Sequence, residues 1–176
     1  MSCFMTCIES QSALFSLRPA RAADDAFLFR LFGETQDQLA LIRPNQALWE
    51  TLVEIQYRGR KMSYGENYPA AEDAILCLGS EAAGRLLINR ESDCMRIVDV
   101  AVLAQWRGQG IGTWALRHCQ QQAAETGVRI ELTVNPMNRA RLLYESLGFR
   151  ATEEDAMRVA MTWSPAAADC GSPRLS

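Results

Sequence analysis

The segment from Val98 to His118, VDVAVLAQWRGQGIGTWALRH, constrains the fold more than any other part of the chain. An apolar run typical of a central strand leads into glycines at three alternate positions, Gly108, Gly110 and Gly112, and then into a helical pattern. Because glycine has no Cβ and adopts positive φ readily, successive backbone N–H groups can point into one concavity at the helix N-terminus. Such a concavity binds phosphate, and Arg107 can add a charge-assisted hydrogen bond.

Two common phosphate-binding loops do not fit this spacing. A Walker loop requires GxxxxGK[ST], and no Lys followed by Ser or Thr comes after these glycines in that register. The dinucleotide-binding fingerprint G-x-G-x-x-G requires a parallel βαβ unit, whereas here the third glycine comes one residue early and the preceding strands form a meander. Nucleotide hydrolysis and dinucleotide binding are therefore disfavoured.

The rest of the chain reads as one domain over residues 13–163, with tails at 1–12 and 164–176. A chain of 176 residues buries enough surface for one core without a disulfide or zinc site. The pattern predicts an α/β (α+β) fold with a mixed, mostly antiparallel central sheet flanked by helices. Strands are expected at 14–17, 74–78, 84–89, 95–103, 129–134, 149–152 and 158–163, helices at 26–40, 46–57, from the glycine loop to about 125, and at 138–147, and a polar loop or frayed helix end at 58–69.

The composition indicates which classes of partner and which cellular compartment to expect. The 18 Lys and Arg against 21 Asp and Glu give a net charge of −3, which argues against a nucleic-acid partner. No stretch approaches the ~18 consecutive apolar residues of a membrane span, so no membrane partner is expected. The six cysteines form no CxxC pair and no disulfide framework, which indicates reduced thiols and a cytoplasmic protein.

Metal and histidine chemistry are also disfavoured. The sequence has no HxxxH and no Cys/His cluster, so we expect no metal. His118 is the only histidine and lies inside the predicted glycine-loop helix without a flanking motif, so no catalytic role is assigned to it. Cys94 and Cys119 fit apolar faces and are expected in the core.

A second segment, VNPMNRARLLYESLGF at residues 134–149, adds to the glycine loop. The two segments resemble the signatures of the GNAT-type N-acetyltransferase superfamily, R/Q-x-x-G-x-G/A before a helix and then Asn-x-x-A-x-x-L-Y-E-x-L-G-F, and the order of elements over about residues 14–163 agrees. The resemblance implies transfer of an acetyl group from acetyl-CoA to a primary amine, of a small molecule or a peptide, by direct attack in a ternary complex. Because members of the family often form dimers, the resemblance also implies a homodimer. A non-catalytic CoA-binding or regulatory module and an enzyme with a longer acyl donor remain alternatives.

The resemblance also implies where the cofactor lies. The family's CoA pyrophosphate is held by loop backbone, which here is that of Arg107, Gly108, Gln109, Gly110, Ile111 and Gly112. The pantetheine arm would run beside the main chain of Val100, Ala101 and Val102 like an added strand. Asn138 matches an asparagine that contacts the cofactor in the family, although it could also cap the helix. The family often has a proline before the loop, where this chain has Ala104-Gln105-Trp106.

Tyr144 is the predicted general acid. A phenol with a pKa of ~10 is protonated at neutral pH and can donate to the departing thiolate, and in the family the tyrosine at this place lies near the CoA sulfur. The alternative is a tyrosine that only packs on its helix. The general base stays open between Asp99 and Glu131, on adjacent predicted strands, and solvent-facing carboxylates that play no such role.

The acceptor is expected to be chosen by the region from Glu34 to Pro69, which is variable in the family. Aromatic and acidic side chains there could line a pocket for a cationic amine. The candidates are Tyr57, Tyr64, Glu66 and Tyr68.

Overall fold

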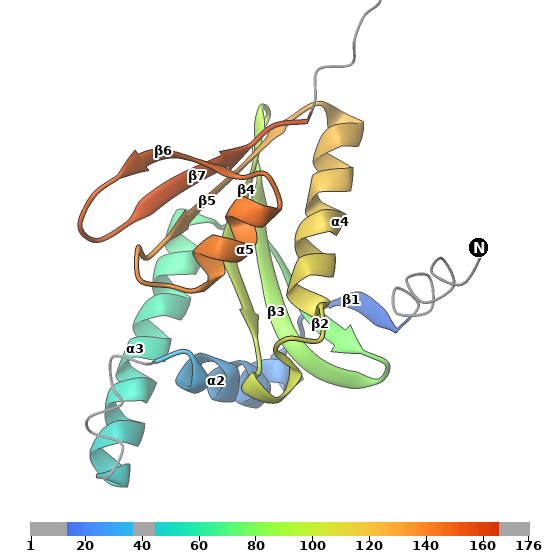
Figure 1. The fold of residues 1–176 in the computed structure, drawn as a ribbon. Coiled ribbons are helices and arrows are strands. Elements are labelled where there is room, and N and C mark those ends of the chain that lie inside the picture. The colour runs from blue at the N-terminus through green and yellow to red at the C-terminus, as the bar shows by residue number, and fades with distance from the viewer. Residues whose placement is uncertain (1–13, 37–44, 166–176) are drawn as a thin grey trace, which may run out of the picture. The chain divides into compact units, whose positions relative to one another are not determined.

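The computed structural model of the protein describes residues 14–36 and 45–165 (Figure 1). The strands are β1 (Phe15–Pro19), β2 (Glu72–Leu78), β3 (Glu81–Arg90), β4 (Cys94–Val102), β5 (Arg129–Val134), β6 (Arg150–Glu154) and β7 (Val159–Trp163). The helices are α2 (Asp25–Glu34), α3 (Gln46–Asn67), α4 (Ile111–Thr126) and α5 (Ala140–Ser146), with short 3-10 turns η1 (Ala22–Asp24) and η3 (Ala104–Trp106).

The strands form a sheet in the order β1-β2-β3-β4-β5-β7-β6. The pairs β1/β2, β2/β3, β5/β7 and β6/β7 are antiparallel, which confirms the predicted fold class. The chain divides into two compact units, one of residues 1–90 and 97–116 and the other of residues 91–96 and 117–176. The expected domain limits at 13 and 163 stay predictions, because 1–13 and 166–176 lie outside the described residues.

The first unit is built on the β2–β3 hairpin. Apolar side chains of these strands, such as Ile75, Leu76 and Leu86, are at most 1% exposed, as expected for strands buried on both faces. Helix α2 packs against both α3 and β3. Asn45 caps α3, its side-chain oxygen accepting the N–H of Leu48 at 3.2 Å.

Helix α3 corrects the sequence prediction at 58–69. This stretch, expected to be a loop or a frayed end because of its polar residues and two glycines, continues the helix to Asn67. A glycine costs a helix only about 1 kcal/mol relative to alanine, and Lys61 anchors the segment with a 2.6 Å bond to Asp25 of α2. Tertiary contact thus outweighs the local glycine penalty.

Helix α2 is shorter than the predicted 26–40, because it ends at Glu34. The Thr35 hydroxyl donates to the carbonyl of Phe32 at 2.7 Å, and the Gln36 side-chain amide donates to the same carbonyl at 3.2 Å. The same carbonyl also accepts the backbone N–H of Thr35 at 3.0 Å, so three donors meet at the end of the helix. Residues 37–40 of the predicted helix lie outside the described residues.

The second unit is the β5–β7–β6 sheet with α5 and the later part of α4. Residues Ile130, Leu132, Val159 and Met161 supply its core at 4% exposure or less. Cys119 is 0% exposed in α4, and Cys94 is 1% exposed. Both thiols are therefore core residues, as predicted.

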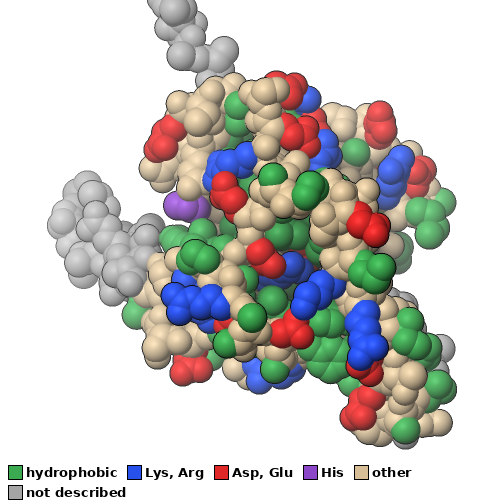
Figure 2. All heavy atoms as spheres, turned by 180° about the vertical axis from the view of Figure 1, so that it is seen from behind, with side chains coloured by type: hydrophobic (Ala, Val, Ile, Leu, Met, Phe, Trp, Pro, Cys, Tyr) green, Lys and Arg blue, Asp and Glu red, His purple; other side chains and the backbone are tan. Residues whose placement is uncertain are grey.

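On the face in Figure 2, acidic and basic side chains are interspersed among apolar ones. No helix in the ranges 14–36 and 45–165 combines the length and the apolar composition that crossing a membrane requires.

Candidate active site

The glycine loop lies between η3 and α4 in the first unit. Gly108 and Gly110 have φ of 76° and 88°, in the left-handed region that favours glycine. A Cβ built on either residue would meet nothing within 4 Å, so the space beside the loop is open. The N–H groups of Gly108, Gln109 and Gly110 have no hydrogen-bond acceptor among the described residues. Together with the start of the 16-residue helix α4, these donors can bind an anion.

Arg107 holds the loop through a contact that the sequence did not predict, and its contact with phosphate stays a prediction. Its Nε donates to the carbonyl of Val102 at 2.9 Å, which ties the loop to the end of β4. The loop is held from a second side, because the N–H of Ala104 donates to Glu34 of α2 at 2.9 Å. The predicted phosphate loop and the predicted pantetheine strand, Val100 to Val102, are thus joined in one unit.

A close backbone approach marks β4 at Ala101. A Cβ on Gly84 of β3 would lie 2.3 Å from the Ala101 carbonyl oxygen, a distance that no side chain allows. The N–H of Leu103 then donates to the carbonyl of Ala83 at 2.9 Å. Gly84 therefore sets the position of the β4 main chain where the pantetheine arm is expected.

Beside Ala101 the first unit contains a cavity of about 510 Å³. This volume lies within the range of small-molecule sites. Apolar side chains line part of it, among them Leu28, Leu31 and Phe32 of α2. Its charged lining residues are Arg21, Asp25, Arg60, Lys61, Asp73, Arg85 and Asp99.

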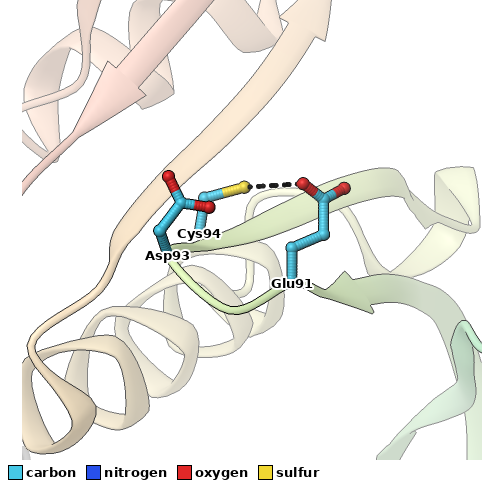
Figure 3. Close-up of side chains that lie close together, drawn as sticks. All are labelled: Glu91, Asp93 and Cys94. Carbon is cyan, nitrogen blue, oxygen red and sulfur yellow. Dashed lines mark hydrogen bonds between the residues drawn. The ribbon is translucent and has the colours of Figure 1, made fainter.

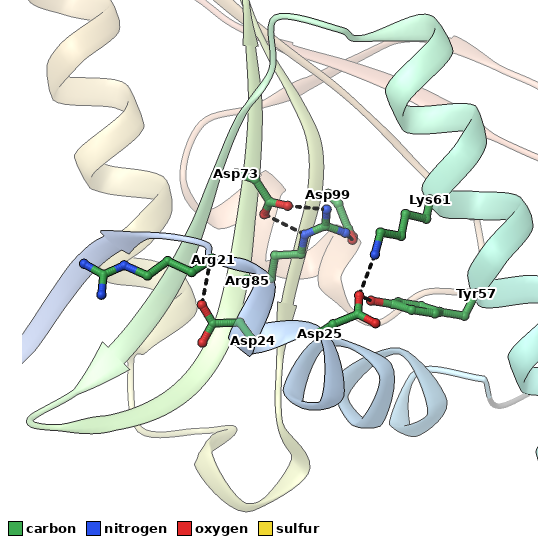
Figure 4. Close-up of polar contacts among 8 residues, drawn as sticks. All are labelled: Arg21, Asp24, Asp25, Tyr57, Lys61, Asp73, Arg85 and Asp99. Atoms are coloured by element: carbon green, nitrogen blue, oxygen red, sulfur yellow. Dashed lines mark hydrogen bonds and ion pairs between the residues drawn. The ribbon is translucent and has the colours of Figure 1, made fainter.

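Arg85 is the centre of the charged wall (Figure 4). Its Nε and Nη2 donate to the two oxygens of Asp73 at 2.9 and 2.8 Å, a bidentate pair. Nη1 lies 3.4 Å from Asp99 Oδ2, a longer contact. The Arg85 guanidinium also lies 5.5 Å from the ring centre of Tyr64.

These surroundings change the acidity of Asp99, whose side chain is 21% exposed. Burial raises the pKa of its carboxyl above the ordinary value, and the positive charges of Arg85 and Arg60 only partly oppose this. Burial, with the negative charge of Asp99, also raises the pKa of Tyr64 to about 12, so that phenol stays protonated. A raised pKa makes the carboxylate a stronger base than an ordinary aspartate, which suits the removal of a proton from an amine and favours Asp99 as the candidate base.

A second polar group joins α2 to α3. Asp25 accepts from Lys61 at 2.6 Å and from the Tyr57 hydroxyl at 2.9 Å. These bonds lower the pKa of the Asp25 carboxyl, whereas burial and Asp25 raise the pKa of Tyr57 to about 12. The guanidinium of Arg60 lies 4.8 Å from the ring centre of Phe32.

Tyr144 and Asn138 belong to the second unit. Tyr144, in α5, is 6% exposed, and its ring lies edge-on to Phe149 at 5.9 Å. The Asn138 side chain accepts the N–H of Ala140, the first residue of α5, at 2.9 Å and so closes the turn that leads into this helix. The catalytic and cofactor-contacting roles of these two residues stay predictions.

The other candidates have structural partners. Glu131 accepts from Arg96 at 2.8 Å and from Arg129 at 2.7 Å, so two guanidinium groups already engage this alternative base. His118 Nε2 lies 3.1 Å from the side-chain nitrogen of Gln122 one turn later in α4. These contacts argue for structural roles.

Glu91, Asp93 and Cys94 bring their ligand atoms within 4.8 Å of one another in the second unit (Figure 3). Both carboxylates already have cationic partners, since Arg129 lies 2.7 Å from Asp93 and Arg96 lies 3.6 Å from Glu91. The Cys94 thiol donates to Glu91 at 3.4 Å, and burial raises its pKa to about 11. A protonated thiol is a poor metal ligand, so the group has the properties of a polar cluster.

Sequence reasoning named Tyr57 and Tyr64 but missed Arg60, Lys61, Asp73 and Arg85. Tyr57, Arg60, Lys61 and Tyr64 are spaced i, i+3, i+4 and i+7, so they share one face of α3. That spacing could have identified the face had the segment been taken as helical. Of the four candidates named for the pocket, Tyr57 lines the cavity, whereas Tyr64, Glu66 and Tyr68 are not among its lining residues.

Comparison with known families assigns the chain to a class. A model described as the Acetyltransferase (GNAT) family matches residues 41–149, more than half of the sequence. The chain belongs to this family and is an acyltransferase of the acetyl-CoA-dependent class, as predicted. A search of curated protein sequences finds no significant match.

Solved structures share the fold at low sequence identity. The PaiA N-acetyltransferase of Thermoplasma acidophilum, solved with coenzyme A, is 13% identical with a TM-score of 0.66, over 85% of this chain and 98% of that one. The ribosomal-protein-S18-alanine N-acetyltransferase of Escherichia coli is 16% identical with a TM-score of 0.62, over 92% and 99%. Naa50 of Arabidopsis thaliana, solved with the bisubstrate analogue CoA-Ac-MVNAL, is 20% identical with a TM-score of 0.59, over 86% and 99%.

Proposed function

We propose that the protein transfers an acetyl group from acetyl-CoA to a primary amine by direct attack in a ternary complex. The observation that carries the proposal is the continuity of β4 with the glycine loop. Open N–H donors of Gly108 to Gly110 suit the pyrophosphate, and Ala101 borders both the pantetheine path and the cavity. Donor and acceptor sites would then meet at one strand.

The proposed chemistry uses Asp99 and Tyr144. The amine enters as an ammonium ion, and Asp99 removes one proton, directly or through a water. The neutral nitrogen attacks the thioester carbonyl carbon, and the C–S bond breaks as the tetrahedral intermediate collapses. Tyr144 gives its proton to the thiolate and regains one from the attacking nitrogen, directly or through a water, while Asp99 releases its proton to solvent, so the products are free CoA and a neutral amide. A catalytically inactive CoA-binding module would bind the donor and release no CoA.

The first test is a calorimetric titration with acetyl-CoA, comparing the wild type with Gly110→Glu. The new side chain would place a carboxylate at the open concavity, where it repels phosphate, so we expect saturable binding to the wild type and none to the variant. Gly79→Glu is the matched control, because Gly79 also has positive φ, at 59°, and open space beside it, but lies in the β2–β3 turn. Absence of wild-type binding would overturn the proposal.

The expected homodimer, the cytoplasmic location and the amine partner stay predictions. A screen over amines and peptides, read as N-acetyl product by mass spectrometry, follows once donor binding is established. Competition between acetyl-CoA and longer acyl-CoA donors tests the identity of the acyl group.

A further inference from the structure

The charges of the cavity do not all cancel in pairs. Two of its carboxylates have a close cationic partner, Asp25 with Lys61 at 2.6 Å and Asp73 with Arg85 at 2.8 Å. Among residues 14–36 and 45–165, the one ion pair of Asp99 is the longer 3.4 Å contact to Arg85, which Asp73 already engages with two bonds. Arg85 therefore brings one positive charge to two carboxylates, Asp73 and Asp99.

A positive charge is left over as well. Arg60 lines the cavity from α3 and forms no ion pair with any carboxylate of the described residues. Its guanidinium lies against the Phe32 ring, 4.8 Å from the centre, which holds the group in place without neutralising it. Arg21, the other arginine without a paired carboxylate in the lining, does not supply this charge, because its guanidinium points away from Arg85 in Figure 4.

Arg60 and Asp99 act on each other without touching. The charge of Arg60 lowers the pKa of the Asp99 carboxyl, so the two groups interact electrostatically, yet they form no ion pair within 4.0 Å. Two opposite charges that face one cavity and leave space between them complement a molecule that carries both charges. The apolar side chains of Leu28, Leu31 and Phe32 provide the remaining surface.

Resting on the proposed function, we propose that the acceptor is a small α-amino acid with an apolar side chain. Its amino group faces Asp99 next to Ala101, where the thioester is expected. Its carboxylate faces Arg60, and the guanidinium can donate two parallel hydrogen bonds to it. Its side chain packs on the α2 wall. This arrangement distinguishes a free amino acid from a peptide N-terminus and from a polyamine, neither of which brings an anion next to the amine.

The test compares three forms of each acceptor at saturating acetyl-CoA. Alanine, leucine and phenylalanine are assayed beside their α-amides, which lose the negative charge at nearly constant size, and beside the corresponding decarboxylated amines. The amide group lowers the pKa of the neighbouring amine, so the amide is the better nucleophile at neutral pH. A preference of at least about tenfold in kcat/KM for the amino acid, as expected for a charge-assisted pair, therefore cannot come from nucleophilicity.

Arg60→Gln identifies the residue responsible. We expect this variant to raise KM for the preferred amino acid about tenfold, with little change in kcat and no loss for the amide, and Arg60→Lys to restore part of the difference. Arg58→Gln is the matched control on the same helix, because Arg58 pairs with Glu54 and does not line the cavity. It should leave all constants unchanged.

Three results would overturn the inference. The amides or decarboxylated amines are used as well as the amino acids; Arg60→Gln lowers kcat/KM equally for all forms; or acetyl-CoA binds but none of the three amino acids is acetylated. Failure of acetyl-CoA to bind, by contrast, would overturn the proposed function itself.

Discussion

Asp99 and Arg85 show how a single residue's surroundings decide its chemistry. Arg85 forms two hydrogen bonds with Asp73 and a longer 3.4 Å contact with Asp99, so one guanidinium serves both carboxylates. Burial then dominates and raises the pKa of the Asp99 carboxyl. Glu131, on β5, has two guanidinium partners instead. The two candidate bases therefore differ in environment although both were expected on strands.

We expect Asp99→Asn to lower kcat/KM about a hundredfold, the usual contribution of a general base. The acidic limb of the wild-type pH profile, which lies above the ordinary carboxyl value of 3.8 because the pKa of Asp99 is raised, should disappear. A raised folded-state pKa means that ionised Asp99 disfavours folding as pH rises through that pKa. The variant should therefore unfold in urea at an equal or higher midpoint at pH 7. Unchanged activity would exclude Asp99 as the base.

Tyr144→Phe tests the proton donor. Removing the hydroxyl leaves the ring packed on Phe149, so folding should change little. Loss of a general acid should lower kcat about a hundredfold and leave KM for acetyl-CoA nearly unchanged. Steady-state kinetics with the same acceptor measures both constants, and circular dichroism verifies the fold. A variant with wild-type kcat would reduce Tyr144 to a packing residue.

At the scale of elements, the approach of β4 to β3 depends on one missing side chain. We expect Gly84→Ala to destabilise the protein by about 1–3 kcal/mol, because its Cβ would lie 2.3 Å from the Ala101 carbonyl oxygen and the strands would have to separate. Movement of Ala101 should also weaken acetyl-CoA binding. Urea unfolding and calorimetry measure the two effects.

Gly59→Ala is the matched control for this substitution. Gly59 lies inside α3 with nothing within 4 Å of an added Cβ. Alanine should therefore stabilise the protein, by about 0.5–1 kcal/mol, through its higher helix propensity. Equal effects of the two alanines would contradict the assigned close approach.

At the scale of the whole molecule, the features that the sequence predicted are those set by residues close together in the chain. The strands around β2, β3 and β5 were predictable, because short apolar runs in β2 and β3, alternating apolar residues in β5 and a Gly79–Ser80 turn mark them within a few positions. The loop at Gly108 and Gly110 was predictable for the same reason, since consecutive residues carry its geometry. Contact between distant segments was not.

Two misses illustrate the limit. The helical continuation at 58–67 depends on Lys61 reaching Asp25, 36 residues earlier. The clamp of Arg85 on Asp73 depends on the register of β2 against β3, in which Ile75 stands opposite Arg85. Neither relation has a local pattern, so the charged half of the cavity could not be assembled from the sequence.

The length of α3 has one more consequence, for the thermodynamics of acceptor binding. Tyr57, Arg60, Lys61 and Tyr64 belong to one continuous helix rather than to a flexible loop. Ordering a loop residue requires roughly 1–2 kcal/mol of backbone conformational entropy, and folding has already met this cost for the helical wall. Binding of the acceptor should therefore carry only a small entropic penalty from this segment. The rate of binding should not be limited by its ordering.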